Sequence, residues 1–319
     1  MNVVEGRVVR TDAKVCHVAL EPGSPPIQAA LRGSLFEDLQ GMKNPVAVGD
    51  LVKVDVSSEP AALLEILPRR NRLGRIASAH DPREQVLVAN VDQLLVIGSL
   101  SKPGFSSART DRILAACADY SIPSVLVINK IDLAEEDEVE EIAATYEQIP
   151  IPVLRTCAVD GRGIDELRAL LQDKVSVLYG ASGAGKSTLV NYLQPGLNIK
   201  EGKISKYWSA GKHTTSYSQL HPLDFGGWVI DTPGIRAFRL HGVPIERLRD
   251  LFGEFGRYQG KCRFPTCTHD HEPGCAVWDA VDRLELPASR YASYIDLLIE
   301  ADPARAVEGD EFESPDEEP

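Results

Sequence analysis

The sequence is poor in aromatic residues, has few cysteines for its length and contains no long apolar run. Aromatic residues make up 6% of the 319 positions, and six positions are cysteine. This number is too small for a disulfide scaffold of such a size. No apolar run approaches the length of a membrane span, and the N-terminus lacks the basic segment and apolar core of a secretory signal. We therefore expect a cytoplasmic protein with no membrane partner.

Basic residues are also scarce. The chain has 34 Lys and Arg against 47 Asp and Glu, which gives a formal net charge of −13. Much of the excess lies in residues 300–319, which contain nine acidic residues and one arginine. Because Pro, Glu and Asp dominate there, we predict an acidic disordered tail at 301–319. The first 75 residues are nearly balanced in charge, so the overall acidity neither supports nor excludes a local nucleic-acid surface.

A phosphate-binding loop is the strongest motif in the chain. The pattern GASGAGKST follows an apolar run and precedes apolar residues at helical spacing, which predicts a strand, a loop and a helix. Its glycines let successive backbone N–H groups point at a phosphate that the helix N-terminus also attracts. Lys186 would reach the β- and γ-phosphates, and Ser187 would hold Mg²⁺. The residues predicted to bind phosphate are Gly180, Ala181, Ser182, Gly183, Ala184, Gly185, Lys186, Ser187 and Thr188.

Two further motifs at the ends of predicted strands indicate that the base is guanine. A buried carboxylate at Asp132 can accept hydrogen bonds from N1–H and from the exocyclic N2–H of guanine. Adenine would leave this carboxylate unpaired, so the site would reject it. Asn129 and Lys130, in the same NKID motif, would brace the base and the loops around it. The segment that contains Cys157 and Ala158 would present a backbone N–H to guanine O6.

The motif DTPG at 231–234 ends another predicted strand, where an aspartate that faces Mg²⁺ belongs. This places Asp231 and Gly234 at the catalytic centre. Mg²⁺ would also bind a threonine of the motif GKHTT, for which we choose Thr215, although Thr214 stands beside it.

Ras-type hydrolysis uses a glutamine just after this second motif to orient the attacking water, but the chain has Ile235 there. We therefore expect slow intrinsic turnover. His213 could orient or deprotonate the water, a group from a partner could do so instead, or His213 could be an ordinary loop residue.

Alternating strand and helix patterns across 86–240 predict a parallel α/β sheet. We expect strands at 93–97, 124–128, 152–156, 175–179, 217–222 and 227–230, with helices at 110–118, 136–148, 164–172 and after the phosphate loop. The base-reading motifs precede the phosphate loop, whereas in a Ras-like domain they follow it. The sequence therefore predicts a circularly permuted P-loop GTPase domain.

A small β domain is predicted at 1–67. Five short β-rich runs separated by Gly, Pro and Asp suit an OB-type barrel, a fold often used on nucleic acid. With Phe36 as its one aromatic residue, RNA binding and a barrel without ligand both remain open. A basic linker at 68–85 contains four arginines in seven positions, which could neutralise phosphates or simply be solvated.

The C-terminal segment 241–300 is predicted to be a small helical zinc-binding domain, with helices at 245–255 and 288–300. Three thiols and one imidazole fall within fourteen residues and form a closed tetrahedral zinc set. The predicted ligands are Cys262, Cys267, His269 and Cys275. His271 is a competing imidazole, whereas the lone Cys16 and Cys117 are interpreted as buried small hydrophobic residues.

The permuted order, the GKHTT motif, the barrel and the cysteine cluster together resemble the RsgA/YjeQ family of ribosome small-subunit-dependent GTPases. The resemblance covers roughly residues 1–300. It implies a GTP hydrolase in late maturation of the small ribosomal subunit, which binds the subunit and its rRNA in the GTP state and is released on hydrolysis. It also implies one structural zinc ion and Mg²⁺ with GTP, and we expect a monomer. The alternative function is a GTP-gated RNA-binding scaffold with incidental turnover.

Overall fold

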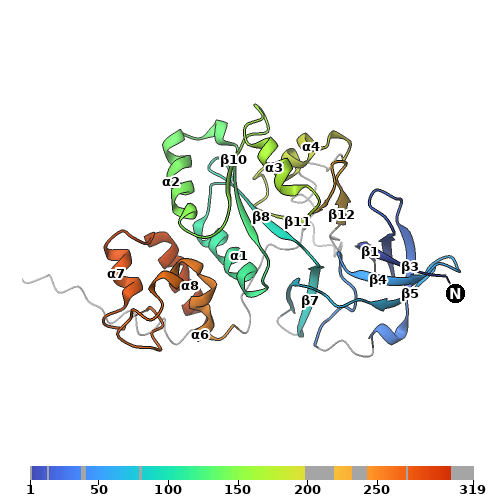
Figure 1. Ribbon diagram of the computed structural model, residues 1–319, viewed down its shortest axis with the longest axis horizontal. Helices are drawn as coiled ribbons and strands as arrows, with labels where there is room; N and C mark the ends of the chain where they lie inside the picture. Colours follow the sequence, from blue (N-terminus) through green and yellow to red (C-terminus); the bar gives the residue numbers. More distant parts are fainter. Residues whose placement is uncertain are drawn as a thin grey trace, which may run out of the picture. The chain divides into compact units, whose positions relative to one another are not determined.

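The computed structural model describes residues 2–12, 14–36, 41–78, 81–197, 219–231, 243–270 and 272–302. They form two compact units (Figure 1). The first contains the N-terminal strands and an α/β sheet, and the second contains residues 106–116, 148–150 and the C-terminal segment. None of the described helices has the length and apolar character needed to cross a membrane.

The N-terminal strands close into a five-stranded barrel. They are β1 (Val3–Thr11), β2 (Val15–Ala19), β3 (Ile27–Leu31), β4 (Leu51–Asp55) and β5 (Ala61–Ile66). Their order is β1-β2-β3-β5-β4, β1 pairs again with β4, and the β3–β5 pair is parallel. Alternate residues such as Val52 and Val54 point into the barrel core, as the two-residue period of a strand requires. This confirms the predicted OB-type barrel.

The segment predicted to be a basic linker folds in large part as a second, two-stranded sheet. Strands β6 (Arg72–Ser78) and β7 (Asp81–Ala89) are antiparallel. Leu73 and Val88, which pair across the hairpin, are fully buried. The sequence did not indicate this hairpin, because its buried apolar residues, such as Leu73, lie among arginines.

Four arginine side chains that the structure describes in this segment form ion pairs: Arg69 with Asp50, Arg70 with Asp92, Arg72 with Glu84 and Arg83 with Asp81. Arg69 donates to both carboxylate oxygens of the fully buried Asp50, at 2.7 and 2.8 Å. It is therefore a structural cation that anchors the end of the barrel. Arg70 and Arg72 keep side-chain exposures of 61% and 46%, so contact with phosphate remains open for them.

The α/β sheet has the six predicted strands. They are β8 (Gln93–Ser99), β9 (Ser124–Asn129), β10 (Val153–Thr156), β11 (Val175–Tyr179), β12 (Gln219–Pro222) and β13 (Trp228–Asp231), in the order β10-β9-β8-β11-β13-β12. The first five strands in this order are parallel, but β12 is antiparallel to β13. The expected all-parallel sheet is wrong at this edge because a tight turn through Gly226 and Gly227 is too short for a crossover. Strand β12 also pairs with β1 of the barrel, through Gln219 and Arg10.

Three helices belong to this sheet: α2 (Glu136–Glu147), α3 (Ile164–Leu171) and α4 (Lys186–Leu193). Most of α1 (Ser107–Asp119) belongs to the second unit. Helices α3 and α4 share one apolar core with alternate residues of the strands, such as Ile97 of β8 packed in the same cluster as Leu167 and Val190. Neighbouring strand residues point to the opposite face and are also buried, so the central strands are apolar throughout.

The second unit is built from short elements. They are α6 (Ile245–Leu248), the 3₁₀ turns Arg249–Leu251 and Gly253–Tyr258, α7 (Ala276–Asp282) and α8 (Ala288–Ala301). The predicted continuous helix at 245–255 is wrong because Phe252 leaves helical geometry, with φ −101° and ψ 88°. Two glycines follow it, at 253 and 256, and glycine is a poor helix former. Helix α7 was not predicted, and Cys275 caps its N-terminus.

A buried charged group joins three segments of this unit. Arg290 of α8 donates to Asp111 of α1 and to Glu254, both at 2.6 Å. All three side chains are at most 3% exposed, and the guanidinium lies 4.7 Å from the centre of the Phe252 ring. The pairing crosses 179 positions of sequence between Asp111 and Arg290, so no local pattern predicts it.

Candidate active site and metal centre

The phosphate loop lies at the carboxyl end of β11, in the place that its sequence predicts. Glycine is required at two of its positions for steric reasons. A Cβ on Gly180 would lie 2.3 Å from the carbonyl oxygen of Ile97, and one on Gly185 would lie 2.2 Å from Nδ2 of Asn129. Gly185 also has φ +95°, a left-handed conformation that disfavours other residues. The backbone can therefore pass close to the ends of the neighbouring strands and still curve around an anion.

Lys186 and Ser187 begin helix α4, directly after this loop. The Lys186 ammonium group donates to the carbonyl oxygens of Gly180 and Ala181, at 2.7 and 3.0 Å. It is thus held across the loop, while the N-terminus of α4 adds its own partial positive charge. This arrangement suits a bound phosphate chain, with the Ser187 hydroxyl group in the first turn next to the lysine.

Side-chain hydrogen bonds connect the guanine-reading motif to the phosphate loop. Asn129, 2% exposed at the end of β9, donates from Nδ2 to the carbonyl oxygen of Ala184 at 2.9 Å. Its own Oδ1 accepts from the hydroxyl group of Thr156, at the end of β10, at 3.0 Å. Lys130 has left-handed φ of 61° and donates from Nζ to the carbonyl oxygen of Gly183 at 2.6 Å. The structure therefore brings together the ends of three strands that the sequence treats separately.

Asp132 is exposed, so the expected burial of its carboxylate is wrong for the chain alone, and this carboxylate contacts the Cys157 thiol. The Cys157 thiol donates to Oδ1 of Asp132 at 3.0 Å. Burial raises the pKa of this thiol, and its hydrogen bond to Asp132 raises that pKa further. The thiol therefore remains a proton donor near neutral pH. Sequence reasoning missed this contact because nothing in the spacing of the two residues indicates where the thiol points.

Backbone hydrogen bonds decide which of two N–H groups, that of Cys157 or that of Ala158, is available to guanine O6. The Cys157 N–H donates to the carbonyl oxygen of Arg162 at 3.0 Å, so it is already used within the loop. No residue in the described part of the chain accepts from the Ala158 N–H. Between the two predicted residues, Ala158 is therefore the donor that is available to a base.

Three predicted catalytic residues lie outside the described residues: His213, Thr215 and Gly234. The alternative Thr214 and the isoleucine at position 235 lie outside them too. The backbone of Asp231 is described, and it pairs with Leu178 one position before the end of β11. The second magnesium motif therefore begins beside the strand that leads into the phosphate loop.

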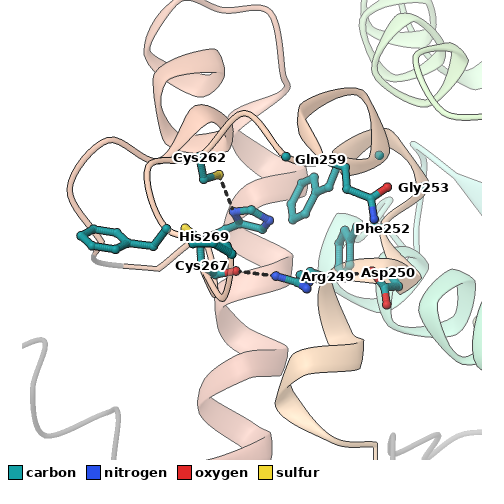
Figure 2. Close-up of a pocket in the computed structure, with 13 residues that line it drawn as sticks. Arg249, Asp250, Phe252, Gly253, Gln259, Cys262, Cys267 and His269 are labelled. Atoms are coloured by element: carbon teal, nitrogen blue, oxygen red, sulfur yellow. Dashed lines mark hydrogen bonds and ion pairs between the residues drawn. The ribbon is translucent and has the colours of Figure 1, made fainter.

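The four predicted metal ligands converge in the second unit. The residues are Cys262, Cys267, His269 and Cys275, and their ligand atoms lie within 4.8 Å of one another. Nδ1 of His269 is 3.6 Å from Sγ of Cys262 (Figure 2). It is 3.4 Å from Sγ of Cys275. Such spacings suit atoms around one tetrahedral ion. The cluster can hold a metal ion, and its imidazole is that of His269; the competing His271 lies outside the described residues.

Other groups hold these ligands in place. Backbone N–H groups of Ala276 and Trp278, both at 3.4 Å, donate to the sulfur atoms of Cys262 and Cys275. The carbonyl oxygen of His269 accepts from the Tyr291 hydroxyl group at 2.9 Å. Burial lowers the pKa of His269, which keeps its imidazole neutral, the form that binds metals. The segment thus contains ligands, the correct imidazole protonation state and supporting hydrogen bonds.

The sequence matches a family model and several known proteins of the same family. The family model RsgA GTPase matches residues 66–241. A small ribosomal subunit biogenesis GTPase RsgA from Caldanaerobacter subterraneus is 39% identical over 302 residues, which cover 94% of this chain and 96% of that protein. One of the same name from Chlorobaculum tepidum is 42% identical over 266 residues, 80% of this chain and 85% of that one.

Two solved structures have the same fold over almost the whole chain. The crystal structure of YjeQ from Thermotoga maritima has a TM-score of 0.75 and 32% identity, covering 93% of this chain and 98% of that one. The structure of YloQ, described as a circularly permuted GTPase, has a TM-score of 0.70 and 29% identity, with coverage of 95% and 96%.

Proposed function

The chain belongs to the RsgA GTPase family, and from this we propose that it hydrolyses GTP during maturation of the small ribosomal subunit. One observation in the structure carries the proposal. Asn129 contacts both the phosphate loop and Thr156, so the guanine motif and the phosphate loop form one hydrogen-bonded site despite their inverted order in the chain. A loop that bound phosphate alone would not need this connection.

The residues that would hold GTP divide by task. Asp132 accepts from N1–H and N2–H of guanine, and the Ala158 N–H donates to O6. Lys186 and the backbone of the phosphate loop bind the β- and γ-phosphates. Ser187 and Thr215 would hold Mg²⁺, and the DTPG motif would contribute Asp231, which would face the ion, and Gly234. Mg²⁺ supplies neutralisation of the charge that develops on the phosphates.

Hydrolysis also needs a group that orients the attacking water. The isoleucine at position 235 cannot do this, so we assign the task to His213 or to a group of the ribosomal subunit. Either assignment gives slow turnover for the chain by itself. The subunit would then accelerate hydrolysis, and hydrolysis would release the protein from the matured subunit.

The metal in the second unit is proposed to be zinc with a structural task. A Cys₃His set is typical of closed zinc sites, and all four positions around the ion are taken by protein ligands. The surrounding core is small and made from short elements, so metal binding contributes to its folding.

Steady-state GTPase rates with and without purified small subunits test this function. We expect a low rate alone and at least a tenfold higher rate with subunits, both abolished by Lys186→Ala. The alternative, a GTP-gated RNA-binding scaffold with incidental turnover, is favoured by the missing glutamine. It predicts GTP-dependent binding to subunits without acceleration of hydrolysis.

A further inference from the structure

A pocket of about 470 Å³ opens beside the metal cluster in the second unit (Figure 2). Its walls include Cys262, Cys267 and His269 on one side and the aromatic residues Phe252 and Phe255. The size falls within the range of about 300–1,000 Å³ that is usual for small-molecule sites. Three of the four cluster residues line it, so the pocket adjoins the metal site and extends from there to the aromatic wall.

The edge of this pocket has an unusual charge for so acidic a chain. No acidic residue occurs from 255 to 269, whereas Arg257, Lys261 and Arg263 do. Arg257 donates to a backbone carbonyl group, but Lys261 and Arg263 form no ion pair with any residue in the described part of the chain. Their side chains are exposed. They form a basic rim, defined here as Lys261 and Arg263, that suits a phosphate backbone.

Aromatic rings lie directly under these cations. The Arg263 guanidinium is 5.6 Å from the centre of the Phe264 ring, and the Lys261 ammonium group is 5.7 Å from that of Tyr258. Phe264 lines the pocket and is 40% exposed, so its ring is accessible to a ligand. An exposed ring flanked by cations is the arrangement on which unpaired bases stack.

Polar groups at the pocket match the edge of a base. Gln259 offers a donor and an acceptor, and Asp250, the one carboxylate among the described residues that line the pocket, offers an acceptor. Arg249 offers donors at the same wall, where it also binds the carbonyl oxygen of Cys267 at 2.9 Å. Arg249 also lies 3.9 Å from a carboxylate oxygen of Asp250. A nucleobase presents both donors and acceptors in one plane, so it can match this set of groups, which an apolar side chain cannot.

We propose that this pocket and its basic rim bind one unpaired nucleobase, together with the adjoining phosphates, from a single-stranded segment of RNA. The choice of RNA rests on the proposed function, but the site itself is assigned from its rings, charges and polar groups. Phe264 stacks on the base, the rim binds phosphates, and Gln259 contacts the base edge.

The test uses the full, metal-loaded chain and a single-stranded RNA octamer of uridine with one central 2-aminopurine. Stacking on an aromatic ring quenches the fluorescence of this base. We expect quenching with the unaltered chain and its loss with Phe264→Ala, with affinity lower by about five- to a hundredfold. Phe264→Trp should restore both. Leu284→Ala removes an apolar side chain of 88% exposure that does not line the pocket, and it should change neither.

Lys261→Gln and Arg263→Gln should each weaken binding and lower the slope of log affinity against log salt by about 0.7 for each lost phosphate contact. Equal quenching by the unaltered and Phe264→Ala chains would overturn the proposal. So would a photoreactive group at position 264 that crosslinks to a ribosomal protein and not to RNA in purified small subunits. The octamer measurement needs no hydrolysis and no ribosome. It therefore tests RNA binding at this pocket even if the proposed GTPase function is wrong.

Discussion

The Cys157 thiol donates to Oδ1 of Asp132 at 3.0 Å, between the segments that follow two neighbouring strands. Asp132 is exposed, whereas Cys157 is fully buried, so the thiol supports the carboxylate from the protein side and leaves its outer side to solvent. A carboxylate oriented in advance loses less entropy when it binds guanine.

Replacing this thiol tests its role. Cys157→Ala should lower the affinity for GDP and GTP about three- to tenfold, because one hydrogen bond to a charged group is lost. Cys157→Ser keeps a donor of similar size and should remain close to the unaltered protein. Equilibrium binding of a fluorescent GDP analogue measures all three. Equal affinities for the alanine and serine variants would show that the thiol only fills space.

Asp132→Asn tests guanine specificity itself. The amide offers a donor where guanine also has one, so GTP affinity should fall by at least tenfold, while xanthosine triphosphate, with an oxygen at C2, should bind better than GTP. Competition between the two nucleotides measures this change. Unaltered protein that binds ATP and GTP equally well would contradict the assignment.

Removing the metal should unfold much of the second unit. Cys267 and Cys275 belong to the same apolar core as Phe252, Phe255 and Tyr294, so loss of the ion would disturb the packing of that core. We expect close to one zinc ion per chain in protein purified without added zinc. A chelator should then increase amide hydrogen exchange across 243–302, with little change in the barrel. A metal-free chain with full protection in this segment would disprove the site.

Arg290→Met should destabilise the protein by about 3–5 kcal/mol, because it leaves the buried Asp111 and Glu254 without their cation. Adding Asp111→Asn and Glu254→Gln to this variant should recover much of the loss, since both charges are then removed. Denaturant unfolding of the single and triple variants measures the difference. A triple variant no more stable than Arg290→Met would indicate that packing of the arginine matters more than its charge.

The two cysteines outside both sites give a pH prediction. Burial raises the pKa of Cys16 and of Cys117 from 9.0 to about 12. The folded state therefore holds these protons more tightly than the unfolded state, so their stabilisation is complete below pH 9.0 and is lost as the pH rises toward about 12. At pH 8, iodoacetamide should not modify Cys16 or Cys117 in the native protein. It should modify both in the denatured protein. Rapid native labelling of either would contradict their burial.

The sequence by itself determined the strand, loop and helix around Lys186, the place of the NKID motif after β9 and the four residues that converge as possible metal ligands. Each is a local pattern: residues close together in the sequence set the geometry of a glycine-rich loop or of a cluster of cysteines. Such features can therefore be predicted without knowing which distant residues pack against them. The permuted order was also visible, because it concerns only the succession of motifs along the chain.

Tertiary structure decided what distant residues do to one another. It pairs Arg69 with Asp50 in place of a solvated linker, sets β12 antiparallel to β13, and closes Arg290 on Asp111 across 179 positions. It also directs the Cys157 thiol to Asp132 and leaves Phe264 exposed above a pocket. These features depend on side-chain direction and on which surfaces remain uncovered after packing, and both are fixed only when the whole core has formed.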